Sequence, residues 1–311
     1  YLVCLGVFFM VVVIDPCYEE LGAKVVSLGG FDVLDLEYKV FPDGEVYFRV
    51  LGDVSGRDVG VIVGCFPFGQ SDCVLRGLFI VRTLKDLGAG RVVVVFPYFP
   101  FARQDKRFLS GECVSARVVA ELVNFAGADV IATVDVHAVD VYGFLGDRFV
   151  NISSVPVWCE FFRREFGRDF FLVAPDEGRV GVVREMARVL GVPYTGFRKV
   201  RDLRTGAIVG LELLDEREFL DLVSRFDIAV VFDDMISTGG TAARVISKMR
   251  EMFNGRIVAA FTHGLFLPGS VRKLLKAGVS EIVATDTVKN AFSKLSVAPL
   301  IVDFLKKVLR E

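Results

Sequence analysis

Short runs of β-branched and aromatic residues recur along the chain, and segments with helical periodicity lie between them. The runs are as long as single strands and apolar throughout, which is typical of strands covered on both faces of a sheet. A first strand is predicted over residues 10–14. Further buried strands are predicted over residues 91–96, 130–134, 171–174, 228–232, 257–261 and 282–285.

Three intervening segments carry apolar residues three and four positions apart, which predicts helices that bury one face. Ser115 is expected to cap the first helix, Gly191 to end the second, and residues 254–255 to end the third. The three apolar stripes are Val118, Val119, Leu122 and Val123; Val182, Val183, Met186 and Leu190; and Ala242, Val245, Ile246 and Met249.

Alternating strands and helices predict an α/β fold with an open, mainly parallel sheet covered by helices, because parallel neighbours need crossover connections. Such sheets bind ligands beyond the carboxyl ends of their strands. A chain of 311 residues is long enough for two domains. The polar stretch 151–156 is the best candidate linker, so we expect two tandem related domains over residues 1–155 and 156–311, with a last helix able to pack back on the first.

Charge and composition limit the classes of binding partner and the cellular compartment that are expected. The net charge of −2 gives no general attraction to nucleic acids, so none is expected as a partner. The six cysteines show no C-x-x-C spacing, and we expect them to be reduced, in a cytoplasmic protein. The mean hydropathy is high, at +0.50. The apolar stretch 1–14 is nevertheless too short to span a bilayer, so no membrane partner is expected. Residues 1–9, which precede Met10, are interpreted as a mis-assigned start or a disordered extension.

The strongest chemical signal follows the predicted strand 228–232, where paired carboxylates lead into a small, hydroxyl-rich loop that opens a helix. Its glycines allow close approach of an anion, and the helix N-terminus supplies oriented N–H groups, so the loop predicts a phosphate site. Asp233 and Asp234 suit sugar hydroxyls or hydrated Mg²⁺ better than phosphate. A capped turn with solvated acids is the alternative. The loop consists of Ser237, Thr238, Gly239, Gly240 and Thr241.

Residues 233–241 resemble the ribose-phosphate loop of type I phosphoribosyltransferases and of ribose-phosphate diphosphokinases, the PRPP synthetases. The first family is expected to have one such domain and a base pocket, whereas the second has two related domains and an ATP site. The stretch 96–107 is similar to the ATP-binding segment of the second family, although a basic surface loop is the alternative. Residues 41–45 resemble the nucleotide loop of that family, although alone they indicate only a turn. The resemblance implies ATP contacts by Phe41, Asp43, Gly44, Glu45, Arg103, Gln104 and Asp105.

Further segments also resemble the second family and occur in the same order along the chain as in that family. His137 is the last residue of the segment 133–137, at the end of the strand 130–134, and Asp176 follows the strand 171–174. The resemblance implies that both help to hold Mg²⁺. Residues 197–201 resemble a mobile catalytic flap, which gives Lys199 and Arg201 catalytic roles, and Arg201 also contacts ribose 5-phosphate. A solvated hairpin is the alternative for this basic stretch. His263 is expected to serve packing or loop support only.

The resemblance implies two type I phosphoribosyltransferase folds, an ATP-binding N-terminal domain and a C-terminal domain that binds ribose 5-phosphate. The implied reaction transfers the β,γ-diphosphate of ATP to C1 of ribose 5-phosphate, in a homodimer or higher homo-oligomer. A phosphoribosyltransferase and a non-catalytic regulatory paralogue are the rivals. The chain departs from the family pattern at residues 15–19, at Arg179 and at Ser237, where many members have Asp.

Overall fold

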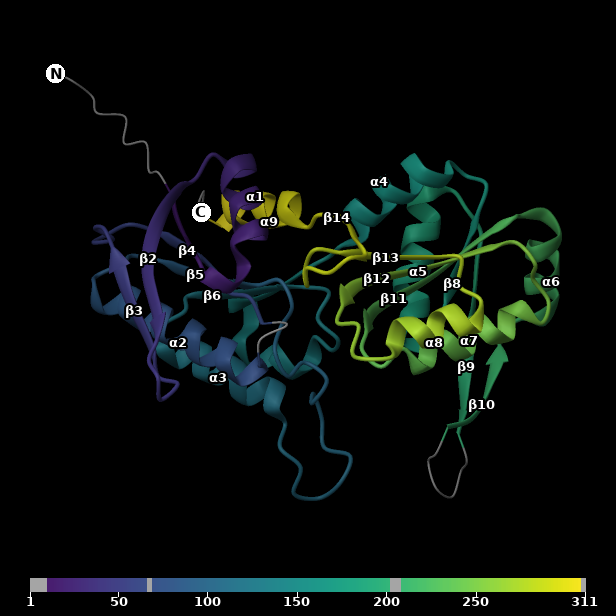
Figure 1. The fold of residues 1–311 in the computed structure, drawn as a ribbon, viewed down its shortest axis with the longest axis horizontal. Helices are drawn as coiled ribbons and strands as arrows, with labels where there is room; N and C mark the ends of the chain where they lie inside the picture. Colours follow the sequence, from purple (N-terminus) through teal and green to yellow (C-terminus); the bar gives the residue numbers. More distant parts are fainter. Residues whose placement is uncertain (1–9, 66–68, 202–207, 309–311) are drawn as a thin grey trace. The chain divides into compact units, whose positions relative to one another are not determined.

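The computed structural model describes residues 10–65, 69–201 and 208–308, and the side chains of 201, 208 and 209 lie outside that description. The chain divides into two compact units, here called unit 1, with residues to 153 together with the segment from 297, and unit 2, with residues 154–296. Each unit contains a seven-stranded sheet covered by helices (Figure 1). Residues 1–9, interpreted above as a mis-assigned start or a disordered extension, lie outside the described residues.

The sheet of unit 1 has the strand order β3-β2-β1-β4-β5-β6-β7. All neighbours are parallel except β2 and β3, which form an antiparallel hairpin. Its strands are β1 (Val11–Ile14), β2 (Asp32–Val40), β3 (Val46–Leu51), β4 (Val59–Ile62), β5 (Val92–Phe96), β6 (Val130–Val134) and β7 (Phe149–Ile152). Its helices are η1 (Pro16–Tyr18), α1 (Glu19–Gly29), α2 (Gln70–Asp86), α3 (Ser115–Ala126), η2 (Asp140–Arg148) and α9 (Ala298–Val308).

Unit 2 repeats this topology, with the strand order β10-β9-β8-β11-β12-β13-β14 and one antiparallel pair, β9 with β10. Its strands are β8 (Phe171–Ala174), β9 (Tyr194–Arg201), β10 (Ile208–Leu213), β11 (Ile228–Ile236), β12 (Arg256–Gly264), β13 (Glu281–Thr285) and β14 (Ser293–Leu295). Its helices are α4 (Val155–Phe166), α5 (Glu177–Leu190), α6 (Glu216–Arg225), α7 (Gly240–Arg250) and α8 (Ser270–Ala277). No helix in the described ranges combines the length and the apolar character of a membrane span.

Alternate residues of the buried strands point to opposite faces of the sheet, and each face has its own core. In unit 2, Leu172 and Val230 pack with α4 and α5. Phe171 and Val231 pack with α6, α7 and α8 on the other face. In unit 1, α1 and α9 share one core, while Figure 1 shows α2 and α3 on the opposite side of the sheet.

The strand order reverses direction between β1 and β4 in unit 1, and between β8 and β11 in unit 2. Open α/β sheets bind ligands at this switch point, beyond the carboxyl ends of the strands. The two units differ in what occupies this switch point. In unit 2 it carries the predicted phosphate loop after β11, whereas in unit 1 protein side chains fill it.

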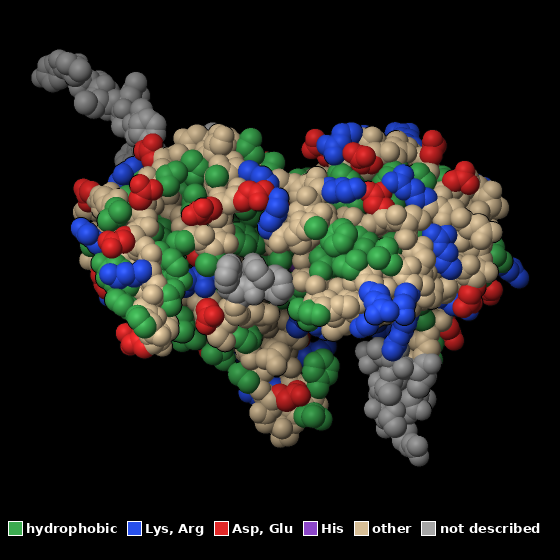
Figure 2. Space-filling model, in the orientation of Figure 1, with side chains coloured by type: hydrophobic (Ala, Val, Ile, Leu, Met, Phe, Trp, Pro, Cys, Tyr) green, Lys and Arg blue, Asp and Glu red, His purple; other side chains and the backbone are tan. Residues whose placement is uncertain are grey.

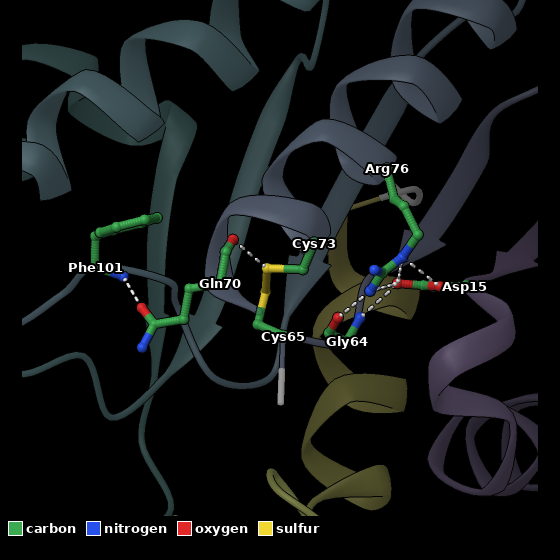
Figure 3. The surroundings of a disulfide bond; sticks show 7 residues. All are labelled: Asp15, Gly64, Cys65, Gln70, Cys73, Arg76 and Phe101. Atoms are coloured by element: carbon green, nitrogen blue, oxygen red, sulfur yellow. Dashed lines mark hydrogen bonds and ion pairs between the residues drawn. A yellow bond between two sulfur atoms is a disulfide. The ribbon is translucent and has the colours of Figure 1, made fainter. Parts of the chain in front are cut away.

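A buried ion pair closes the switch point of unit 1 (Figure 3). The Arg76 guanidinium of α2 donates to both carboxylate oxygens of Asp15, at 3.0 Å to Oδ2, and to the Gly64 carbonyl at 2.8 Å. The Gly64 N–H donates to Asp15 Oδ2 at 3.2 Å. Asp15 is fully buried and Arg76 is 3% exposed. The departure from the family pattern at residues 15–19 therefore coincides with a cation that is held inside the unit.

The expectation that the cysteines are reduced is wrong for Cys65 and Cys73, which form a disulfide beside this ion pair (Figure 3). Seven residues separate them in the sequence, a spacing that predicts nothing by itself. The fold brings them together because Cys65 follows β4 and Cys73 lies in the first turn of α2. Cys17, Cys113 and Cys159 are free thiols.

Three local predictions also need correction. Ser115 is the first residue of α3 rather than its cap, and Val118 and Leu122 are each 43% exposed, because the buried stripe of α3 lies one residue away, on Ala116, Val119 and Val123. The linker predicted over 151–156 is largely ordered structure, since β7 ends at Ile152 and α4 begins at Val155. The remaining two residues, 153 and 154, still mark the division between the units.

Candidate functional site

The site of unit 2 is built on β11, which is longer than predicted. Its pairing with β12 continues through Asp233 to Ile236, so both carboxylates lie on the strand rather than after it. The loop that follows turns at Gly239, whose φ of +73° is favourable for glycine, and α7 begins at Gly240. No hydrogen bond of the described residues uses the backbone N–H groups of Thr238 or Gly240. These groups are available to an anion at the helix N-terminus.

The segment before α8 holds this loop in place. The Leu265 N–H donates to the Ile236 carbonyl at 3.0 Å, and the Leu267 N–H donates to the Ser237 carbonyl at 3.1 Å. Lys273 Nζ, on α8, donates to the Thr238 carbonyl at 3.1 Å. A Cβ at Gly239 would approach the Ser270 carbonyl to 3.2 Å. The loop is therefore restrained through its carbonyl groups, which leaves the N–H groups of Thr238 and Gly240 available to a ligand.

The two aspartates on β11 differ in their surroundings. Asp234 is buried and its Oδ2 lies 3.4 Å from Arg179 Nη1 of α5. Asp233 is half-buried. Burial and the neighbouring Asp234 and Asp176 carboxylates raise the pKa of Asp233 well above its usual range, although Arg179 opposes the shift. Asp233 thus keeps exposed surface for a ligand, whereas Asp234 is engaged inside the protein.

Asp176 and Lys199 complete this site. Asp176 precedes α5 at the carboxyl end of β8, and its Oδ2 accepts a hydrogen bond from Lys199 Nζ at 2.5 Å. Both side chains are partly exposed, at 22% and 26%. Lys199 reaches the site from β9, the first strand of the β9–β10 hairpin. The side chain of Arg201 and residues 202–207 lie outside the described residues, so the predicted roles of Arg201 stay predictions.

Unit 1 presents the predicted ATP residues on two turns. Between β5 and α3, Phe101 has a positive φ of 57°, and its N–H donates to Gln70 Oε1 at 2.6 Å. Two residues later Arg103 is exposed, and Gln104 Oε1 accepts a hydrogen bond from Ser115 Oγ at 2.6 Å. Strained backbone of this kind is concentrated at functional sites. Asp105 is half-buried and contributes to the raised pKa of Tyr142, for which burial is the main cause.

The β2–β3 turn carries the other predicted ATP residues. The Phe41 N–H donates to the Glu45 carbonyl at 2.8 Å, and Gly44 has a φ of 94°. The Asp43 carboxylate accepts the Glu45 N–H at 3.1 Å. The Phe41 ring is 41% exposed, and Lys39 Nζ lies 5.1 Å from its centre. An exposed aromatic ring at a rigid turn can stack on a planar ligand.

The two histidines differ in their surroundings. His137 is exposed and lies beyond the carboxyl end of β6, as predicted from the sequence. His263 is 2% exposed, and its Nδ1 forms a hydrogen bond with Thr287 Oγ1 at 2.9 Å. His263 is thus packed inside unit 2, and its supporting role stays a prediction.

Known proteins resemble this chain over most of its length. A family model described as the N-terminal domain of ribose phosphate pyrophosphokinase matches residues 10–127. The ribose-phosphate pyrophosphokinase of Methanothermobacter thermautotrophicus is 36% identical over 292 residues, which cover 93% of this chain and 97% of that protein. The chain belongs to the ribose-phosphate pyrophosphokinase family.

Other members extend the likeness over both units. The ribose-phosphate pyrophosphokinase of Mycobacterium leprae is 30% identical over 300 residues, covering 94% of this chain and 90% of that protein. The crystal structure of phosphoribosylpyrophosphate synthetase from Mycobacterium smegmatis superposes with a TM-score of 0.84 at 27% identity, and covers 97% of this chain and 99% of that one. The fold predicted from the sequence is confirmed by this match.

The donor chemistry of this family member fits a hard divalent cation. In unit 2, Lys199 pairs with Asp176 and Arg179 pairs with Asp234, while burial first and then the neighbouring carboxylates raise the pKa of Asp233. No group of three or more His, Cys, Asp or Glu side chains in the described part of the chain is arranged to hold a metal by itself. Mg²⁺ bound mainly by substrate phosphates and water needs only one or two protein ligands.

Sequence reasoning missed three residues that organise the sites of this family member. Gln70 positions the Phe101 backbone, Arg179 pairs with Asp234, and Lys273 holds the Thr238 carbonyl. Arg179 was visible as a departure from the family pattern, whereas Gln70 and Lys273 lie 31 and 35 residues from their partners. No local pattern marks a side chain whose partner is a distant backbone group.

Proposed function

We propose that this chain is a ribose-phosphate diphosphokinase that transfers the β,γ-diphosphate of ATP to the C1 hydroxyl of ribose 5-phosphate, giving 5-phosphoribosyl 1-diphosphate and AMP. The observation that carries the proposal is the site of unit 2, where a loop with available N–H groups, the half-buried Asp233 carboxylate and the Asp176–Lys199 pair meet at one switch point. Family membership over more than nine-tenths of the chain supports the same reaction.

The sugar phosphate binds through its two ends. The N–H groups and hydroxyls of residues 237–241 hold the 5-phosphate, and Asp233 accepts hydrogen bonds from ribose hydroxyls, since a carboxylate would repel the phosphate itself. Asp234 belongs to the same subsite and orients the strand through Arg179. Arg201 is assigned to the sugar phosphate as well, on the resemblance alone.

ATP binds to unit 1 through Phe41, Asp43, Gly44, Glu45, Arg103, Gln104 and Asp105. The exposed Phe41 ring suits the adenine, and the exposed Arg103 guanidinium suits a bidentate phosphate contact.

Charge stabilisation supplies most of the rate in phosphoryl transfer. His137 and Asp176 would help to hold Mg²⁺, which when bound would supply charge neutralisation for the ATP phosphates. Lys199 starts from its ion pair with Asp176 and moves to the transferring oxygens as negative charge develops there. Arg201 shares this catalytic role. The β9–β10 hairpin that carries both residues excludes water when it closes over ATP.

The cellular setting belongs to the same proposal. We place the enzyme in the cytoplasm, as a homodimer or higher homo-oligomer, without nucleic acid or membrane partners. The Cys65–Cys73 disulfide is unusual for that compartment, in which lasting disulfides are found mainly in proteins of hyperthermophiles.

The deciding assay measures AMP formation from ATP and Mg²⁺ with and without ribose 5-phosphate. Strict dependence on the sugar phosphate is expected. AMP released equally without it would overturn the proposed transfer. Activity that appears only when 5-phosphoribosyl 1-diphosphate and a nucleobase are supplied would instead indicate a phosphoribosyltransferase.

A further inference from the structure

A basic groove in unit 2, formed by α7, α8 and β10, lies outside the residues assigned to either substrate. Its volume is about 680 Å³, and its lining combines a few small or apolar residues with several long charged side chains. Figure 2 shows Lys and Arg side chains gathered over α8. The charged groups that line the groove are Arg244, Lys248, Glu251, Lys273 and Lys276.

The groove carries an excess of positive charge. Four cations face it and one carboxylate, so its formal charge is 4 − 1 = +3. Glu251 is already paired with Lys248, at 2.5 Å. Among the residues that the structure describes, no carboxylate lies within ion-pair distance of Arg244 or Lys276, and both are exposed. Like charges gathered in a groove attract a multivalent anion.

We propose that this groove binds a chain of two or more phosphoryl groups and that its occupation weakens binding of ribose 5-phosphate. Lysine ammonium groups bind phosphate as mobile point charges, and several of them around an open groove suit a linear polyphosphate better than one phosphate. None of the described lining residues is aromatic, so a nucleoside base would find no stacking surface. Recognition is therefore of the phosphoryl chain itself.

Lys273 links the groove to the loop of residues 237–241. This part of the inference rests on the proposed function of that loop. Lys273 Nζ now donates to an uncharged carbonyl, that of Thr238, in the ribose-phosphate loop. A polyphosphate in the groove offers Lys273 a stronger, charged acceptor. Loss of the Lys273 contact frees the loop that must hold the 5-phosphate. Gly210 and Leu211 of β10 line the same groove, so the anion also contacts the hairpin that carries Lys199.

The first test measures binding without turnover. The full chain is titrated with inorganic tripolyphosphate by calorimetry, in EDTA and at fixed ionic strength, as wild type and as Lys276→Ala and Arg244→Ala. Each groove variant is expected to weaken one class of sites at least about tenfold. The matched control is Arg272→Ala, an exposed cation on the same helix that does not line the groove, and it should change affinity less than about twofold.

Equal affinities for wild type and both groove variants would overturn the assignment, as would an equal loss in Arg272→Ala, which would indicate only general surface charge. ATP titrated in the same way should show the same fold-loss in Lys276→Ala. A loss confined to ATP would contradict recognition of the phosphoryl chain alone.

The second test measures the coupling. Lys273→Met should raise KM for ribose 5-phosphate with little change in kcat, and tripolyphosphate should raise the same KM in wild type but not in Lys276→Ala. A KM that stays unchanged in Lys273→Met would overturn the coupling. Because binding is measured without catalysis, localised binding in an inactive protein would refute the proposed reaction and leave the groove intact, whereas normal AMP formation with no groove effect would refute only the groove.

Discussion

Lys199 is the residue whose geometry argues most directly for a chemical role. Its ammonium group is held at 2.5 Å from Asp176 while about a quarter of the side chain stays exposed, at 26%. The next residue back along β9, Arg198, is equally cationic but pairs with Glu212 on β10 at 2.8 Å, away from the site. Neighbouring residues of a strand point to opposite faces, so only one of the two reaches the aspartates.

Lys199→Ala is expected to lower kcat at least about 10²-fold, because charge on the transferring oxygens loses its cation. The KM for ribose 5-phosphate should change little, since the phosphate loop is untouched. Steady-state AMP formation measures both values. Arg198→Ala is the matched control and should keep near-normal kcat; a normal kcat in Lys199→Ala would remove this residue from the catalytic role.

Asp233→Asn should stabilise the protein at neutral pH. The folded-state pKa of Asp233 is raised, so the native state binds more protons than the unfolded state between the unfolded and folded pKa values. Stability contributed by this group is therefore full below the unfolded pKa and is lost as pH rises through the folded pKa. The uncharged amide avoids that loss, so the variant should be more stable than wild type at pH 7.5, and this gain should vanish near pH 4, about the pKa of an unfolded aspartate.

Urea denaturation of Asp233→Asn and wild type at the two pH values measures this difference. Activity should fall at the same time, because a ribose-binding carboxylate is lost. A destabilised variant at pH 7.5 would show that Asp233 is not held under electrostatic strain.

Among the elements, α2 is fixed at its N-terminal half by contacts that all come from distant segments. The disulfide ties its first turn to the end of β4, Gln70 holds the Phe101 backbone, and Arg76 joins Asp15 and Gly64. These contacts position the turn that carries Arg103 and Gln104. The helix therefore links the closed switch point of unit 1 to its predicted ATP residues.

Arg76→Leu is expected to destabilise the protein by about 3–5 kcal/mol, because it leaves the fully buried Asp15 carboxylate without its cation. The double variant Asp15→Leu with Arg76→Leu should recover part of this loss, since it removes both charges. Arg82→Ala, on the exposed part of the same helix, should change stability by less than about 1 kcal/mol. Chemical denaturation measures all three; a mild effect of Arg76→Leu would mean that water reaches Asp15.

In the molecule as a whole, chain order and spatial order differ at the C-terminus. After unit 2 ends, the chain returns to unit 1 as α9, and Ile301 and Leu305 pack there against Val12 and Val25. Without the segment from 297, this face of the sheet in unit 1 is covered by α1 alone, and the apolar residues that α9 covers are left bare. Unit 2 contains both of its own covering layers.

A fragment of residues 154–296 is expected to fold by itself, whereas a fragment of residues 10–153 should aggregate because one apolar face is exposed. Fusing residues 297–308 to the second fragment through a flexible linker should restore a monomeric fold with cooperative thermal unfolding. The same fusion with Ile301→Glu and Leu305→Glu should fail. Cooperative unfolding of the unfused fragment would show that α9 is dispensable.

The sequence was sufficient to predict the alternation of strands and helices, the buried strands and the glycine-containing turn after β11, because strand and helix periodicity and glycine at a turn are local properties. The resemblance of short motifs also gave the family. Only the tertiary structure decided which carboxylate stays exposed, since Asp233 and Asp234 are adjacent in sequence and differ only in what packs against them. The disulfide, the Arg76–Asp15 pair and the Lys273 contact were likewise beyond the sequence. Each joins segments whose proximity is created by the sheet order and leaves no local pattern.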